Sequence, residues 1–242
     1  MMFTRVILTP ALLMFLSMGA IAQGSWPLDS LLKTSDSRVQ LRDGTGTVVA
    51  TVNTSQLLAM RGVFTGICEA AELNPRLIIA EGNAPNAFAA NIEGRSTVGV
   101  NLGMMKLIGY DTSQWAAVLG HEVAHLKLDH GTSRVLTSIP LELAEIYLRS
   151  STSSYQGVLL GELGRKMLET RFSREQERES DYLGAIWALE AGFEVEGAAR
   201  LHTNMLKRYG ENSGLPFLQS HPTSRERIRE LTELAERLQP ER

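Results

Sequence analysis

Residues 117–131 read AVLGHEVAHLKLDHG, and they contain HEVAH at residues 121–125, a complete H-E-x-x-H pattern. On an α-helix, side chains at positions i and i+4 project from the same face about 6 Å apart along the axis. His121 and His125 can therefore direct one nitrogen each to a single zinc ion. Glu122 lies about 100° around the helix from His121, where it can accept a proton from a water that the metal activates. The spacing predicts two zinc ligands and a general base on one helical turn.

The residues on both sides of the pattern, WAAVLG and HLKL, are apolar enough to favour a buried helix. The alternative is a helix that carries two histidines by chance, but buried imidazoles need partners. Asp111, Thr112 or Ser113 can cap the start of this helix, and Gly131 can end it. A catalytic zinc normally has three protein ligands, so another part of the chain must supply the third.

The composition is that of an ordinary globular protein, with 43% hydrophobic and 21% charged residues in a chain of 242. This length allows one substantial core, and a second domain is not required. The net charge of −3 and the pI of about 6.0 exclude a general basic field for nucleic acid. The mixed charges of Ser224–Arg242 predict a solvated helix. The lone Cys68 cannot form an internal disulfide, and its apolar surroundings indicate a small buried hydrophobic residue.

Residues 1–22 have the pattern of a signal peptide. Arg5 is their only charge, an apolar run follows it, and Ala20-Ile21-Ala22 offers a cleavage site before Gln23. We therefore expect export of a mature chain that begins at residue 23. An uncleaved N-terminal anchor is the alternative interpretation.

The segments between this leader and the metal helix predict a hairpin, a helix and a small sheet. RVQLRDGTGTVVATV looks like two strands at about residues 38–52. An amphipathic helix follows, with Asn53 or Thr54 as its cap. Three strand-like runs then make a small, largely antiparallel sheet beside the metal helix; they are residues 76–82, 86–92 and 96–102.

The second half of the chain is predominantly helical in pattern. Residues 135–148, VLTSIPLELAEIYL, are too short and too charged to span a bilayer. They fit either a helix packed near the active site or a surface that touches membrane or substrate. From residue 157 to the end, helical patterns dominate. The whole predicts an α+β fold, mainly helical, in a single domain over residues 23–242 whose catalytic core covers about residues 54–238.

The third ligand is expected in SREQERESD, at residues 173–181. A carboxylate from this second helix would complete a His₂Glu set, and Glu175, Glu177 and Glu179 compete for the role. Glu177 has Asp181 on its own face at i+4, so one face can offer a ligand together with a carboxylate that supports the site. Glu175 and Glu179 point elsewhere and are expected to be solvated.

These two motifs together resemble the zinc metallopeptidase family that includes the CaaX prenyl proteases and the HtpX-type and Oma-type proteases. That family's second motif reads S-R-x-x-E-x-x-A-D, and the Glu that opens its E-x-x-A-D part binds zinc. Here that residue is Glu177, the Asp is Asp181, and Ser180 stands in place of the Ala. The resemblance implies a gluzincin-like fold and one zinc ion per chain, held by His121, His125 and Glu177. It covers about residues 55–235 and fits the soluble, exported, periplasmic branch without a repeat domain.

Two further family motifs are present in the right order. N-A-F-A appears as Asn86-Ala87-Phe88-Ala89; if this strand is a sheet edge, its backbone can pair with an extended substrate. H-P-x-x-x-x-R-I appears at residues 221–228 and contains His221 and Arg227.

The roles of four polar residues are less direct. His221 is either a helix-entry residue or a catalytic one that reaches the open zinc position or stabilises the oxyanion. Arg227 is either a surface charge or the partner of a site carboxylate, and the family pattern favours the partner. His130 lies about 140° off the zinc face on a continuous helix and is expected to be structural. His202 carries no signal.

The sequence therefore predicts an exported zinc endopeptidase that acts on unfolded or misfolded proteins in envelope quality control. We expect the protein to be periplasmic, either soluble or loosely associated with the membrane. Its possible partners are membrane-surface or outer-membrane assembly proteins, and no nucleic acid is expected. The rival from another class is a chaperone or assembly factor with a latent or structural zinc site. A metal-dependent hydrolase with a non-peptide substrate is a second rival.

Overall fold

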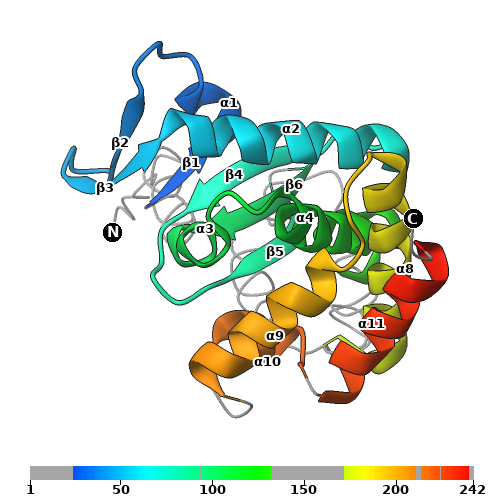
Figure 1. Cartoon of the computed structure of the whole chain (residues 1–242). Coiled ribbons are helices and arrows are strands. Elements are labelled where there is room, and N and C mark those ends of the chain that lie inside the picture. The colour runs from blue at the N-terminus through cyan, green and yellow to red at the C-terminus, as the bar shows by residue number, and fades with distance from the viewer. Residues whose placement is uncertain (1–23, 93, 132–171, 211–213, 224, 240–242) are drawn as a thin grey trace, which may run out of the picture.

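The structure, a computed structural model, describes residues 24–92, 94–131, 172–210, 214–223 and 225–239. The expected signal peptide and the apolar run at residues 135–148 lie outside these described residues. The predicted α+β fold is confirmed (Figure 1). Its elements, in chain order, are β1 (Ser25–Pro27), α1 (Leu28–Leu31), β2 (Arg38–Arg42), β3 (Val48–Asn53), α2 (Thr54–Ala71), β4 (Arg76–Ala80), β5 (Ala87–Ile92), β6 (Arg95–Asn101), α3 (Leu102–Ile108), α4 (Thr112–Lys127), α8 (Arg174–Glu190), α9 (Gly197–Tyr209), α10 (Pro216–Ser220) and α11 (Arg225–Leu238).

The main sheet has four strands in the order β1-β4-β6-β5, and it is largely antiparallel, as predicted. β5 pairs antiparallel with β6, and β1 pairs antiparallel with β4, but β4 and β6 run parallel. β6 therefore lies between β4 and β5, although β5 comes before it in the chain. The last five residues of β6 are buried, which suits a central strand, and β5 lies at the edge. β1 lies between the leader and the predicted hairpin, in a segment where the sequence pattern predicts no strand.

β2 and β3 pair as an antiparallel hairpin at the N-terminal end of α2 (Figure 1). Its turn is fixed by Asp43, whose Oδ1 accepts hydrogen bonds from the backbone N–H groups of Thr45 and Thr47 at 2.9 Å each. On α2, Cys68 is partly buried against the core, and burial raises the pKa of its thiol to about 12. This agrees with its interpretation as a small hydrophobic residue.

α4 is the central element of the fold. It packs against α2, α8 and α9 and against strands β5 and β6, and its residues from Ser113 to Gly120 are buried with one exception (Figure 1). Asp111 caps its start, because its Oδ1 accepts from the backbone N–H of Gln114 at 3.0 Å. The helix ends at Lys127 and not at Gly131, so that expectation is wrong.

The physical reason is a reversal of the backbone directly after Lys127. Asp129 has a φ of 52°, in the left-handed region, which an α-helix cannot continue through. Lys127 also donates from Nζ to the carbonyl of Ala71 at 2.9 Å, which ties the end of α4 to the end of α2. The chain beyond Asp129 therefore leaves the helical path, and the position of His130 does not follow from helix geometry.

α8 crosses α4 closely, through two glycines. A Cβ on Gly184 would lie 2.9 Å from the backbone carbonyl carbon of Gly120 and 2.9 Å from the backbone nitrogen of His121. No side chain fits between the two backbones at this point, so the helices approach more closely than larger residues would allow. A capping box of Ser173 and Gln176 begins α8, and both of its reciprocal hydrogen bonds are present.

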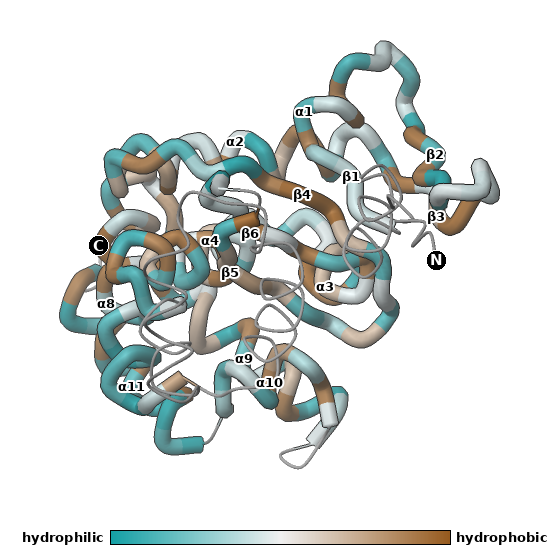
Figure 2. Tube along the Cα trace, turned by 180° about the vertical axis from the view of Figure 1, so that it is seen from behind, coloured by the Kyte–Doolittle hydropathy of each residue, from teal (hydrophilic) through white to brown (hydrophobic). Residues whose placement is uncertain are grey.

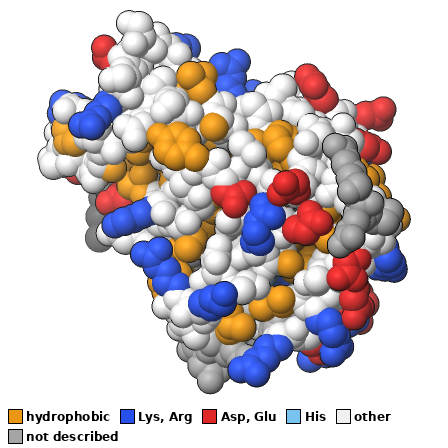
Figure 3. Space-filling model, viewed as in Figure 1, with side chains coloured by type: hydrophobic (Ala, Val, Ile, Leu, Met, Phe, Trp, Pro, Cys, Tyr) orange, Lys and Arg blue, Asp and Glu red, His pale blue; other side chains and the backbone are white. Residues whose placement is uncertain are grey.

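The C-terminal helix α11 packs against α8 and α9 and buries only a few of its residues. They are Arg227, Leu231, Leu234 and Ala235. Figure 2 shows most of α11 in hydrophilic colours and β4 in hydrophobic ones, so the prediction of a solvated helix is confirmed for its described part. Acidic and basic side chains are interspersed over the face in Figure 3. Within the described ranges, no helix combines the length and the apolar character needed to cross a membrane.

Candidate metal centre

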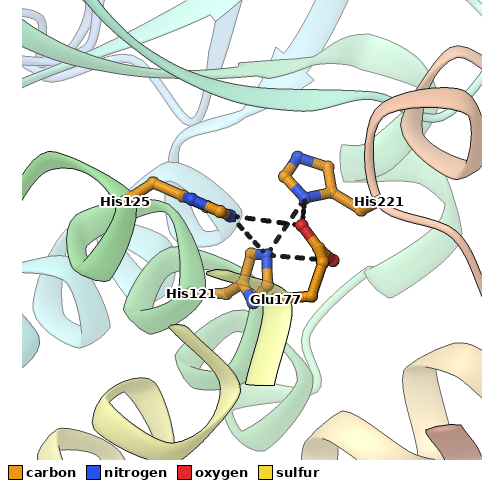
Figure 4. Close-up of side chains that lie close together, drawn as sticks. All are labelled: His121, His125, Glu177 and His221. Carbon is orange, nitrogen blue, oxygen red and sulfur yellow. Dashed lines mark hydrogen bonds and ion pairs between the residues drawn. The ribbon is translucent and has the colours of Figure 1, made fainter. Parts of the chain in front are cut away.

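The H-E-x-x-H residues lie on one turn of α4, inside the molecule. His121 and His125 are buried, and their Nε2 atoms lie 3.0 Å apart. Figure 4 shows both rings directed toward a common point. The i, i+4 spacing thus brings two imidazole nitrogens together, as the sequence predicts.

α8 brings Glu177 to the same point. Glu177 Oε1 lies 3.4 Å from His125 Nε2, and its Oε2 lies 3.7 Å from His121 Nε2. Two ligands at normal bond lengths on a tetrahedral zinc ion are about 3.3 Å apart. The three distances therefore fall around the value that one zinc ion requires, and two imidazoles with one carboxylate are a donor set that zinc accepts. Glu175 and Glu179, the two competing carboxylates, are exposed.

His221, at the end of α10, completes a cluster of four (Figure 4). Its Nδ1 lies 3.0 Å from His121 Nε2 and 2.9 Å from Glu177 Oε1. One ligand atom from each of His121, His125, Glu177 and His221 lies within 4.8 Å of the others, and all four residues are buried. Nδ1 of His221 thus lies where a fourth donor to the same ion would be.

Glu122 lies next to this cluster on α4 and is fully buried. Its Oε1 is 3.3 Å from Nε2 of His221, the ring nitrogen that faces away from Glu177. The sequence-predicted general base is therefore beside the predicted metal ligands, and His221 lies between it and Glu177.

Asp181 and Arg227 support the cluster from behind. Asp181 Oδ1 lies 2.9 Å from His121 Nδ1, the nitrogen opposite the one that faces Glu177. Arg227 donates from Nη2 and Nε to the two oxygens of Asp181, at 2.8 and 3.0 Å, and from Nη1 to Glu177 Oε2. It also donates to the carbonyl of Pro222 at 3.0 Å, next to His221. One buried guanidinium therefore fixes two carboxylates and the loop of His221.

The charges of these groups explain their pKa values in the metal-free site. Burial disfavours the charged form of His121, but the carboxylates of Glu177 and Asp181 outweigh burial and raise the pKa of His121 to about 10. Burial likewise raises the pKa of Asp181, but the Arg227 guanidinium outweighs it and holds this pKa below its ordinary value. The carboxylates thus favour a positive charge at the point where the rings converge. A divalent cation satisfies the same preference.

Two contacts to His125 were not foreseen from the sequence. Phe172 stacks on its ring with centroids 3.8 Å apart and an interplanar angle of 22°, and on the ring of His221 with centroids 5.1 Å apart. His130 Nδ1 lies 2.9 Å from His125 Nδ1. Phe172 directly precedes the SREQERESD motif, which is the one sequence signal that could have drawn attention to it.

The residues expected to hold substrate lie at the edge of the main sheet. Ala87, Phe88 and Ala89 begin β5, but Asn86 precedes the strand. The backbone N–H of Asn86 donates to Oδ1 of Asn101, and its carbonyl accepts from the backbone N–H of Asn101, each at 3.0 Å. Both backbone groups of Asn86 are therefore already used.

Comparisons with known proteins agree with this arrangement. Residues 63–235 match the sequence profile of peptidase family M48. The chain is 31% identical to the mitochondrial metalloendopeptidase OMA1 of Schizosaccharomyces pombe over 119 residues, which cover 49% of this chain and 35% of that protein. It is 27% identical to the metalloprotease LoiP of Escherichia coli K12 over 229 residues, 89% of this chain and 85% of that protein.

A third relative is a protease HtpX homolog of Aeropyrum pernix, 36% identical over 94 residues. The match covers 28% of that protein, so this chain spans about a third or less of the OMA1 and HtpX relatives but most of LoiP. The profile match extends over more than half of the chain and includes every residue of the four-residue cluster. The chain therefore belongs to peptidase family M48, a family of zinc-dependent metallopeptidases.

Proposed function

We propose that this chain is a zinc-dependent endopeptidase in which His121, His125 and Glu177 hold the metal. The observation that carries the proposal is the convergence of these three side chains from two helices, with their donor atoms 3.0 to 3.7 Å apart. Family membership supports the reaction class, and the buried position of Glu122 beside the cluster supports its role as the general base.

In this proposal each residue has a defined task. When bound, zinc supplies Lewis acidity, which polarises the scissile carbonyl and lowers the pKa of water. Glu122 accepts the proton of the attacking water and passes it to the leaving amine. Asp181 holds the Nδ1 proton of His121, so that Nε2 keeps its lone pair for the metal. Arg227 holds Glu177 and Asp181 in place through its fork of donors.

β5 is proposed to hold the substrate. Among the described strands it pairs only with β6, so its other edge is able to add an extended peptide by backbone hydrogen bonds. Ala87, Phe88 and Ala89 are the positions concerned, without Asn86. Recognition through backbone favours unfolded chains over particular side chains. Misfolded proteins of the cell envelope are therefore the substrates that we propose, with export directed by residues 1–22.

The biological setting follows as part of the same proposal. A single metallopeptidase domain over residues 23–242 would act in the periplasm in protein quality control. We include membrane-surface or outer-membrane assembly partners in this proposal. The name of the relative LoiP, a metalloprotease matched over most of both chains, supports the enzymatic part of this proposal.

A second candidate function is favoured by the position of His221. Its Nδ1 lies 3.0 Å from His121 Nε2, where a fourth protein ligand would close the metal site to water. A chaperone or assembly factor with a latent zinc site would have this arrangement at rest. In the endopeptidase proposal, His221 instead leaves this position when substrate binds and can then stabilise the oxyanion, the catalytic role that the sequence leaves open as one alternative.

Replacement of Glu122 by Gln tests the enzymatic role directly. The variant keeps the size of the side chain and all three proposed ligands, so it should bind zinc as wild type does while casein hydrolysis is lost. Zinc content is measured by elemental analysis beside the protease assay. Casein digestion at the wild-type rate by the zinc-loaded variant would refute the assignment of the base.

A further inference from the structure

His130 contacts the back of a proposed zinc ligand. Its Nδ1 lies 2.9 Å from Nδ1 of His125, and both rings are buried. The reversal at Asp129, where φ is 52°, turns the chain back so that this contact forms. His130 is absent from the four-residue cluster, so it faces His125 from the side away from the metal point.

The protons of this pair can be assigned by exclusion. If Nε2 of His125 binds a metal ion, the proton of the neutral ring must be on Nδ1, and this nitrogen donates. The partner Nδ1 of His130 must then accept, so it carries no proton. The neutral ring of His130 therefore has its proton on Nε2. That nitrogen lies 3.4 Å from Oε2 of Glu179, so its proton faces a carboxylate oxygen.

We propose that His130 is a positioning residue for the metal centre. It fixes the tautomer and the rotation of His125 through a series of polar contacts that runs from His125 to His130 and from His130 to Glu179. This inference rests on the proposed function, in which His125 is a ligand through Nε2. The two ligands on α4 then have different supports: Asp181, a carboxylate, behind His121 at 2.9 Å, and a neutral ring behind His125.

The surroundings of the pair add to this argument. Phe172 stacks on His125 at an interplanar angle of 22° and fixes the plane of the ring, but stacking leaves rotation within that plane free. A hydrogen bond at Nδ1 removes this remaining freedom. Ser180 Oγ lies 3.4 Å from His130 Nδ1, and its hydroxyl can donate to that nitrogen when the nitrogen carries no proton.

The test compares the zinc affinities of two variants by competition with a chromogenic chelator. His130→Leu fills the same space without an acceptor, and we expect its zinc affinity to fall about 10- to 100-fold. His130→Asn offers a carbonyl oxygen close to the place of Nδ1, and we expect recovery of most of the affinity. Glu179→Gln keeps an acceptor on an exposed side chain and should change the affinity by less than His130→Leu.

A second measurement reports the proton positions themselves. Nitrogen-15 spectra of the zinc-loaded wild-type protein should show His125 protonated at Nδ1 and His130 protonated at Nε2. Zinc at Nε2 of His125 by itself places the proton of that ring on Nδ1, so the decisive signal is the proton on Nε2 of His130. This measurement decides the inference even if His130→Leu fails to fold.

Two results would overturn the inference: wild-type zinc affinity in a folded His130→Leu variant, or a proton on Nδ1 of His130 in the loaded protein. Failure of the proposed function is distinguished by His125→Ala, measured in the same way. Wild-type zinc affinity in His125→Ala would reject the metal site itself, whereas a loss there with no effect of His130→Leu rejects only the positioning role.

Discussion

Replacement of Gly184 by alanine should separate the two helices that carry the metal ligands. The added Cβ would lie 2.9 Å from the backbone of Gly120 and of His121. A normal carbon contact is about 3.5 Å, so the approach is about 0.6 Å too close, and backbone atoms cannot rotate away as a side chain could. α8 must therefore move away from α4 and take Glu177 with it.

The size of this movement determines its effect on the site. Functional constellations need to be held within about 0.5 Å, and the Glu177 oxygens are already 3.4 and 3.7 Å from the two ring nitrogens. We expect the zinc affinity to fall about tenfold or more, as for other changes that misplace ligands. Overpacking costs about 1–3 kcal/mol, and the helix propensity of alanine returns about 1 kcal/mol. The net change is a loss of about 1 kcal/mol in the free energy of unfolding.

Gly62 provides a matched control on α2, since a Cβ there meets nothing within 4 Å. Gly62→Ala should gain about 1 kcal/mol from helix propensity and leave the zinc affinity unchanged. Both variants are measured by urea denaturation of the metal-free protein and by chelator competition. The reasoning is wrong if Gly184→Ala binds zinc as tightly as wild type and gains stability as Gly62→Ala does.

Three further predictions concern buried side chains around the cluster. Arg227→Met should lower the free energy of unfolding of the metal-free protein by about 3–5 kcal/mol, because it leaves the buried carboxylates of Glu177 and Asp181 without the guanidinium. Urea denaturation measures this change, and a loss below about 1 kcal/mol would contradict the prediction. His221→Ala should raise casein hydrolysis about tenfold or more if His221 closes the resting site, whereas a loss of activity would show that His221 assists catalysis instead. His202 is buried, and burial lowers its pKa to about 3, so it is neutral in the folded state. Below about pH 6.5 the unfolded chain therefore binds one more proton than the folded chain, and the free energy of unfolding decreases as the pH decreases. At pH 5 this loss is about 2 kcal/mol, and His202→Gln should remove it from the pH dependence of the unfolding free energy, while an unchanged dependence would reject the assignment.

The parts of the site that lie on one helix could be predicted from the sequence because helix geometry alone determines them. His121, Glu122 and His125 lie as the 3.6-residue period requires, and Glu177 with Asp181 shares one face of α8. The position of His130 could not be predicted in this way. Its expected offset of about 140° from the zinc face assumed a helix that continues to Gly131, and a single left-handed residue, Asp129, invalidates that assumption.

Tertiary contacts set the remainder of the site. The stacking of Phe172 on His125 and the close pair of Gly120 and Gly184 depend on how helices cross, and no local pattern marks either of them. The order of the main sheet is a similar case. The tight hairpin of β5 and β6 is a local feature, but the parallel pairing of β4 with β6 depends on non-local burial of both strands.

The charges of the buried site link metal binding to the stability of the fold. Three carboxylates, those of Glu122, Glu177 and Asp181, lie in or beside the cluster, and Arg227 neutralises one of them. A divalent cation would balance the remaining negative charge, and in its absence the carboxylates of Glu177 and Asp181 raise the pKa of His121. Because Asp181 and Glu177 of α8 contact both His121 of α4 and Arg227 of α11, the ion that enables the proposed reaction would also add to the contacts that hold these three helices together.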